Sequence, residues 1–171
     1  IKQMQAVDCI FLDPARRNEH GGKTVAISDC EPNVATLEKL LLEKGKQVMI
    51  KLSPMLDLSL AIRDMQHVSE AHIVSVNNEC KELLLLLRPG DDSPEIPSAM
   101  SQPIVCINFA NQEIQRFVFT RGSEQATECS YTHEIGTYLY EPNASILKAG
   151  AFRSIASSFH LSKLHANSHL Y

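Results

Sequence analysis

The sequence predicts an α/β fold, in which the second half of a doubly wound sheet precedes a small α+β unit. Residues 6–12 and 47–53 are nearly continuous apolar runs, which is typical of parallel strands buried on both faces. Residues 71–78 and 81–88 form two further strands with almost no connection between them, so they should be antiparallel neighbours. With a helix after each of the first two strands, this order indicates parallel crossovers that end in a hairpin.

The two connecting helices follow from apolar residues at helical spacing. Residues 34–44 carry such a stripe, and Gly45 is the expected end of that helix. A second, shorter stripe covers residues 58–65, with Asp57 or Ser53 as its N-cap.

Composition divides the chain into three parts. Residues 1–89 form the predicted sheet unit, and residues 90–103 are rich in Pro, Ser and acid, as expected of a linker. Residues 104–171 form the predicted α+β unit. Its expected elements are a hairpin over 104–120 that turns at Asn111, a strand near 138–140, and a helix over 144–159.

Bulk properties exclude several classes of protein. The longest apolar run, Leu83–Leu87, is far shorter than the roughly 20 residues of a membrane span. Five cysteines without a C-x-x-C pair do not indicate a disulfide framework, so a cytoplasmic location is expected. A net charge of −4 argues against a broadly basic nucleic-acid-binding face and leaves a local basic patch open.

Three strand ends carry chemically distinctive residues. The first is Asp13-Pro14-Ala15-Arg16-Arg17, the second brings Lys51 and Ser53, and the third brings Asn77 and Asn78. Ligands of open α/β sheets bind beyond the carboxyl ends of the parallel strands. We therefore expect all three ends to lie on one rim and to meet at a shared mouth.

The residues at the first strand end are suited to orienting and binding polar groups. Pro14 favours an extended Asp13, which would hold the carboxylate at the edge of the sheet. A carboxylate and a nearby peptide carbonyl can orient the N–H bonds of an amino group. Arg16 and Arg17 offer forked donors that suit phosphate or carboxylate. The alternative is that Asp13 caps a turn and the arginines are only solvated.

Four stretches of the sequence resemble known proteins. "VDCIFLDPARR" resembles the fourth-strand motif of class I S-adenosylmethionine-dependent methyltransferases, in the D-P-P-R form of RNA methyltransferases. "VMIKLSPMLDLSLAI", "AHIVSVNNECKELLLLL" and "YLYEPNASILKAGAF" are similar to a bacterial methyltransferase family described only as hypothetical. In that family, a ferredoxin-like region and a THUMP-like domain follow a Rossmann-like sheet.

The resemblance implies S-adenosylmethionine as cofactor and RNA modification as the function. In this reading Asp13 and Pro14 are catalytic, and Asp13 also lines the rim of the cofactor site. Arg16 and Arg17 would hold an anionic substrate. The other expected substrate contacts are Lys51, Ser53, Asn77, Asn78, Asn143 and Lys148.

Alternatives stay open for several of these residues. Lys51 could instead run along the sheet, and Asn143 and Lys148 could belong to a capped helix without a ligand. His160, His165 and His169 match no zinc spacing, so no metal site is expected.

Two departures from the family pattern affect the mechanism. Ala15 replaces the second proline of D-P-P, and Arg16 stands where amino-methylating enzymes usually carry an aromatic residue. The strand end from Lys51 to Met55 contains no cysteine, which argues against a covalent uracil-C5 mechanism. Direct in-line transfer to nitrogen, oxygen or carbon is expected instead.

The sequence has no G-x-G turn, the motif that would hold the cofactor after the first strand of a class I sheet. We therefore expect these residues to be a fragment that is itself inactive and binds the cofactor weakly or not at all. Its first strand would present an unpaired edge and favour self-association. The rival hypotheses are a non-catalytic nucleic-acid-binding or assembly module, and a methyltransferase of small molecules.

Overall fold

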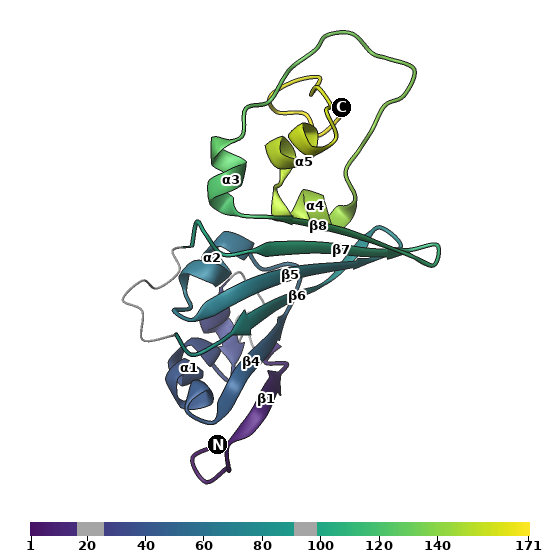
Figure 1. The fold of residues 1–171 in the computed structure, drawn as a ribbon. Coiled ribbons are helices and arrows are strands. Elements are labelled where there is room, and N and C mark those ends of the chain that lie inside the picture. Colours follow the sequence, from purple (N-terminus) through teal and green to yellow (C-terminus); the bar gives the residue numbers. More distant parts are fainter. Residues whose placement is uncertain (17–25, 91–98) are drawn as a thin grey trace.

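The computed structural model describes residues 1–16, 26–90 and 99–171. A six-stranded sheet runs through the molecule (Figure 1). Its strands are β1 (Val7–Leu12), β4 (Gly45–Leu52), β5 (Val68–Val76), β6 (Glu79–Leu87), β7 (Ile104–Ala110) and β8 (Glu113–Phe119). The helices are α1 (Val34–Leu42), α2 (Leu58–Arg63), α3 (Arg121–Ala126), α4 (Ala144–Ala149) and α5 (Phe152–Ser158). A short pair of strands, β2 (Ala15–Arg16) and β3 (Cys30–Glu31), and a 3₁₀ turn, η1 (Ile27–Asp29), complete the described elements.

The sheet is mixed, with strand order β1-β4-β6-β5-β7-β8. Strand β1 pairs parallel with β4, and β5 pairs parallel with β7. Strand β6 is antiparallel to both of its neighbours, β4 and β5. The predicted α/β class and the antiparallel hairpin of β5 and β6 are therefore confirmed.

The sheet continues across the predicted domain boundary at residue 103. The hairpin of β7 and β8 adds to β5 through six parallel residue pairs, from Ala71–Ile104 to Val76–Phe109. Most of the predicted linker, residues 91–98, lies outside the described residues. The division into two domains stays a prediction, and the hairpin assigned to the second unit is part of the sheet of the first.

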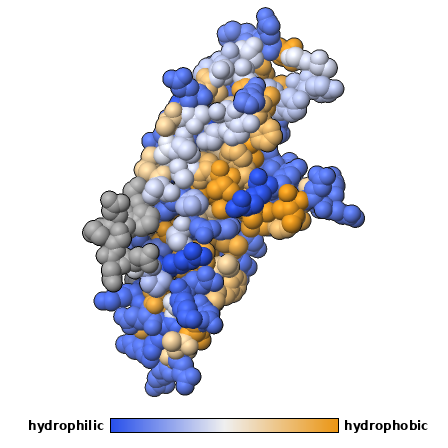
Figure 2. Space-filling view, in the orientation of Figure 1, coloured by the Kyte–Doolittle hydropathy of each residue, from blue (hydrophilic) through white to orange (hydrophobic). Residues whose placement is uncertain are grey.

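Alternation along the strands gives the sheet two different faces. One face buries Ile50, Ile73 and Leu85 in a core shared with α1, α2, α4 and α5. The other face leaves Phe109 and Ile114 exposed, and these two residues are opposite each other on β7 and β8. Figure 2 shows apolar residues gathered in the middle of the molecule, over the strands of Figure 1.

Strand β1 corrects the expectation of a strand buried on both faces. It lies at the edge of the sheet and pairs only with β4, and Val7, Cys9 and Phe11 on it are exposed. A continuous apolar run could not separate an edge strand from a central one, because both carry the same residue types. The expected unpaired edge is present in the described chain, and self-association through it stays a prediction.

The first two helices begin where the sequence predicts. The Asn33 side chain caps α1, and Asp57 accepts a hydrogen bond of 2.8 Å from the Leu60 amide at the start of α2. Gly45 does not end α1, which stops at Leu42 with Glu43 as its C-cap. Instead, Gly45 is buried as the first residue of β4, where an added Cβ would lie 3.0 Å from Ile10.

The C-terminal segment differs more from the prediction. The helix predicted over 144–159 is two helices, because Gly150 takes a left-handed conformation (φ 72°) and ends α4. Residues 138–140 form no strand, although the backbones of Tyr140 and Tyr171 exchange two hydrogen bonds. Helix α3 was not predicted. In Figure 1, α3, α4 and α5 lie together beside β8, at the opposite end of the molecule from β1.

One buried carboxylate joins α1 to the start of β5. Glu38 is 6% exposed and accepts hydrogen bonds from the Gln66 amide, the His67 amide at 2.6 Å and the His67 ring at 3.0 Å. The sequence pattern suggested only a polar residue on the outer side of this helix.

Replacement of Glu38 by Ala should lower the free energy of unfolding by about 2–3 kcal/mol, because two backbone donors lose their acceptor. Urea unfolding of the protein measures this loss, and Glu38→Gln, which keeps one acceptor oxygen, should lose less. Glu43→Ala is the control, since this side chain is exposed near the same helix end and should change stability by less than about 0.5 kcal/mol. Equal losses for Glu38→Ala and Glu43→Ala would contradict the assigned role.

Candidate functional site

The first predicted strand end is held by the short pair of β2 and β3. Pro14 is buried, and the backbone after it pairs with Cys30 and Glu31. This arrangement fixes the chain on the carboxyl side of Asp13, whose side chain is 55% exposed. A half-exposed carboxylate therefore stands at the end of β1, attached to a fixed backbone.

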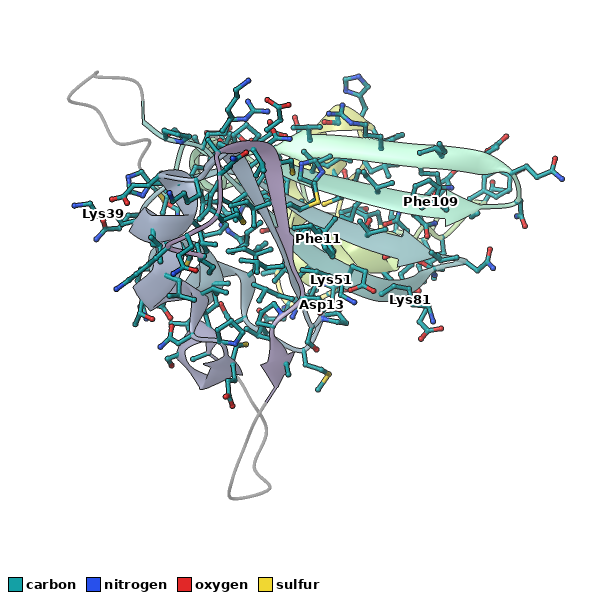
Figure 3. The ribbon with its side chains drawn as sticks, turned by 90° about the horizontal axis from the view of Figure 1, so that it is seen from below. Phe11, Asp13, Lys39, Lys51, Lys81 and Phe109 are labelled. Carbon is teal, nitrogen blue, oxygen red and sulfur yellow. The ribbon has the colours of Figure 1, made fainter. Side chains whose placement is uncertain are left out.

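Lys51 from β4 reaches this carboxylate. Its Nζ lies 2.6 Å from Oδ2 of Asp13 and 3.9 Å from Oε1 of Glu82 on β6. Figure 3 shows Asp13 and Lys51 side by side at the end of β1. The hydrogen bond to Asp13 raises the pKa of Lys51 above its ordinary value; desolvation opposes the shift, and the charge of Glu82 adds to it. Lys51 is thus a fixed cation between two carboxylates.

Ser53 follows directly on the same strand end. Its Oγ accepts a hydrogen bond of 3.1 Å from the Met55 amide, in the turn that leads to α2. It lies two residues beyond Lys51 and is partly exposed. Asp13, Lys51 and Ser53 therefore come from two neighbouring parallel strands at one place on the rim.

The third strand end stands apart from the first two. Asn77 and Asn78 form the tight turn between β5 and β6, with φ values of 48° and 62°. The carboxyl ends of β1, β4 and β5 do share one edge of the sheet, but β4 and β6 lie between β1 and β5. Three strand spacings of about 4.8 Å put the ends of β1 and β5 roughly 14 Å apart.

Figure 3 agrees with this separation. Phe109, which pairs with Val76 at the end of β5, lies far along the sheet from Asp13. The strand order thus corrects the expectation of one shared mouth: the predicted residues form two groups along the edge.

The second group is a cluster of four amide side chains, Asn78, Asn108, Gln115 and Asn143, which we call the amide cluster. Oδ1 of Asn78 accepts a hydrogen bond of 2.7 Å from the Ala144 amide at the start of α4. Oδ1 of Asn108 accepts a hydrogen bond from the backbone N–H of Asn78, and Nδ2 of Asn108 donates to Oε1 of Gln115 at 2.9 Å. Nδ2 of Asn143 donates to the same Gln115 oxygen at 3.1 Å. Sequence reasoning missed Asn108 and Gln115, although a polar Asn108 inside an apolar strand was a usable signal.

Asn143 and Lys148 both have structural contacts. The Asn143 side chain caps α4 by accepting from the Ile146 amide and the Ser145 hydroxyl. Lys148 Nζ donates to the Leu56 carbonyl at 2.7 Å and so joins α4 to the turn before α2. A substrate role for either residue would be additional to these contacts.

A cavity of about 760 Å³ adjoins the amide cluster. It lies between the sheet end at β7 and β8 and the C-terminal segment. Its lining residues are Asn78, Asn108, Ala110, Gln115, Arg116, Phe117, Tyr140, Glu141, Pro142, Asn143, Ile146, Ile155, Phe159, Leu161 and Tyr171.

The predicted anion contacts can be placed only in part. Arg16 lies in β2, directly after the fixed Pro14 and Ala15, and only its backbone position is described. Arg17 lies outside the described residues.

Across residues 1–16, 26–90 and 99–171, no group of three or more His, Cys, Asp or Glu side chains is arranged to hold a metal ion. Within the same ranges, no helix combines the length and apolar character needed to cross a membrane.

The chain is similar to known proteins in two comparisons. Residues 138–171 match a family of ferredoxin-like domains, which confirms the ferredoxin-like region that the resemblance implied. A crystal structure of a "putative methyltransferase" from Porphyromonas gingivalis W83 is 40% identical, with a TM-score of 0.86 over 96% of this chain. This chain spans 39% of the length of that protein. No curated protein matches the chain.

Replacement of Lys51 by Met should destabilise the fold at neutral pH, because two carboxylates then lie close together without their cation. Since the folded-state pKa of Lys51 is raised, its contribution is present below the ordinary value of 10.5 and is lost as pH rises further. Urea unfolding at several pH values between 7 and 12 should show the difference between wild type and Lys51→Met shrinking above pH 10.5.

Lys46→Met is the matched control, since Lys46 pairs with Asp8 on the neighbouring strand and both side chains are more than 80% exposed. Such a pair contributes little to stability. A difference in unfolding free energy between wild type and Lys51→Met that stays constant up to pH 12 would refute the role of the Lys51 charge.

Proposed function

We propose that this chain is part of an S-adenosylmethionine-dependent methyltransferase that modifies RNA by direct in-line transfer. The observation that carries this proposal is the 40% identity, over 96% of the chain, to the protein from Porphyromonas gingivalis. Because the chain spans 39% of that protein, we assign the activity to the complete protein.

The geometry at the end of β1 supports a positioning role for Asp13. Lys51 binds Oδ2 of Asp13, and no described side chain binds Oδ1. The free oxygen, together with a nearby backbone carbonyl such as that of Pro14, could accept the N–H bonds of an amino group and fix the direction of its lone pair. Lys51 holds the carboxylate in its orientation.

The cofactor would supply an activated methyl group on a cationic sulfur. The described residues fit one wall of its site, since a half-exposed carboxylate at a strand end attracts a positive charge. Asp13 would hold the acceptor nucleophile in line with that methyl group, so that transfer is direct. Catalysis would come mainly from alignment, to which Asp13 contributes by holding the nucleophile.

RNA as the acceptor is supported by the residues that follow Asp13. Arg16 and Arg17 follow the buried Pro14 and Ala15 in the sequence and would offer two forked cations to the phosphates of RNA. In this proposal Ser53 lines the same part of the rim, while Asn77, Asn78, Asn143 and Lys148 contact more distant parts of the substrate.

Asp13→Ala should reduce methyl transfer by the full-length protein about 100-fold or more, because the nucleophile loses its alignment. The assay follows the labelled methyl group of S-adenosylmethionine into RNA, and isothermal titration measures cofactor binding separately. Asp8→Ala, an exposed carboxylate on the same strand, is the control and should keep full activity.

Unchanged activity of Asp13→Ala would contradict the proposed site. Absence of S-adenosylmethionine binding by the full-length protein, with RNA binding retained, would support a non-catalytic RNA-binding module instead.

A double Arg16→Ala, Arg17→Ala variant should flatten the salt dependence of RNA binding, because two phosphate contacts are lost.

A further inference from the structure

The 760 Å³ cavity has the size of a small-molecule site and lies away from Asp13. None of the residues at the ends of β1 and β4 lines it. Its walls come from β7, β8 and the C-terminal segment, with Asn78 from the turn after β5. It is therefore a second candidate site, separate from Asp13 and Lys51, and it includes Asn78 and Asn143 of the more distant substrate contacts proposed above.

Two side-chain amides at this cavity have NH₂ groups without an acceptor among the described residues. Oδ1 of Asn78 is occupied by the Ala144 amide, which fixes the orientation of this side chain and leaves its NH₂ group unused. Oε1 of Gln115 accepts from both Asn108 and Asn143, which leaves the NH₂ group of Gln115 unused as well. Among the described residues, neither NH₂ group has an acceptor. The backbone N–H of Asn78 donates to Oδ1 of Asn108, and Nδ2 of the same Asn108 donates to Oε1 of Gln115, so Asn78 and Gln115 both adjoin one residue.

The remaining walls are apolar and partly aromatic. Ile146 and Ile155 are buried, whereas Tyr140 is 49% and Phe159 63% exposed. Phe117 adds a partly buried ring. Exposed aromatic side chains beside a cavity suit a flat ring, because stacking on them removes apolar surface from water.

The charge of the lining argues against a highly charged ligand. Arg116 and Glu141 are its charged residues, and they balance each other. The ligand expected from these walls is therefore a neutral, planar ring that carries hydrogen-bond acceptors.

We propose that this cavity binds a nucleobase with two ring carbonyls, of the uracil type. The unused NH₂ groups of Asn78 and Gln115 donate to the two carbonyl oxygens, and Tyr140 or Phe159 stacks on the ring. The same ring occurs in a free nucleoside or nucleotide and as an unstacked base of RNA. Binding here needs no methyl donor, so this inference and the proposed methyl transfer can fail separately.

Two isosteric substitutions test the donors without removing the structural contacts. Asn78→Asp keeps the oxygen that accepts from Ala144, and Gln115→Glu keeps the oxygen that accepts from Asn108 and Asn143. Each replaces an NH₂ donor by an acceptor oxygen. Gln125→Glu, on the exposed side of α3 and outside the cavity lining, is the control for added charge.

The measurement is binding of uridine and cytidine to the full-length protein, by isothermal titration without S-adenosylmethionine. Cytosine replaces one ring carbonyl by an amino donor, so the wild type should bind uridine about tenfold more tightly. Asn78→Asp and Gln115→Glu should weaken uridine binding about tenfold and bring the two affinities together or reverse their order. Gln125→Glu should behave as wild type. Nucleosides carry no phosphate, so charge repulsion cannot explain a change in this ratio.

Short oligouridine and oligocytidine form the second arm. Preference for oligouridine over free uridine would support the inference with RNA as the source, and equal affinity per base would support it with the free nucleoside as the source. Absence of binding of both uridine and oligouridine would overturn it. Equal affinity of the wild type for uridine and cytidine, or an unchanged preference in both variants, would also overturn it.

Discussion

The position of β6 between β4 and β5 is the constraint on which the arrangement of the candidate sites depends. Because β6 is antiparallel to both neighbours, it separates the parallel strands without reversing them, and their carboxyl ends still share one edge. It also brings Glu82 within reach of Lys51 and fixes Asn78 in a tight turn near α4. One inserted strand thus produces a charged group at β1 and β4, and an amide cluster at β5, β7 and β8.

The two groups differ in the physical chemistry that they offer. At the end of β1, an ion pair with a carboxylate oxygen that no described side chain binds favours the orientation of a polar, reactive group. At the amide cluster, neutral donors and aromatic walls favour recognition of a flat ring without involvement in bond making. Separation of reaction and recognition along one sheet edge would let an extended ligand contact both.

Local patterns in the sequence were sufficient for much of the fold. Apolar runs located β1 and β4, the short connection identified β5 and β6 as a hairpin, and Asp57, one of the two expected N-caps, begins α2. The insertion of β6 and the pairing of β7 with β5 depend on contacts between distant residues, which periodicity does not encode. The unpaired edge of β1 was predicted from the missing G-x-G turn and not from periodicity. The break at Gly150 was readable in principle, since glycine commonly ends helices in the left-handed conformation.

The candidate sites were predictable to a similar extent. Asp13 and Lys51 were identified as strand-end residues, and their ion pair follows from the parallel pairing of β1 with β4. Asn78 of the amide cluster bonds Ala144, which is 66 positions away, so no local motif could show this arrangement.

Strand β1, which pairs with β4 alone among the described residues, also offers a way to observe this part of the sheet in solution. Cys9 is exposed on that strand, whereas burial raises the pKa of the Cys106 thiol to about 12 and keeps it unreactive. A thiol-reactive fluorophore would therefore attach to Cys9 in preference to Cys106. From that position, its emission would respond to any polypeptide that lies against the side of β1 with which no described strand pairs.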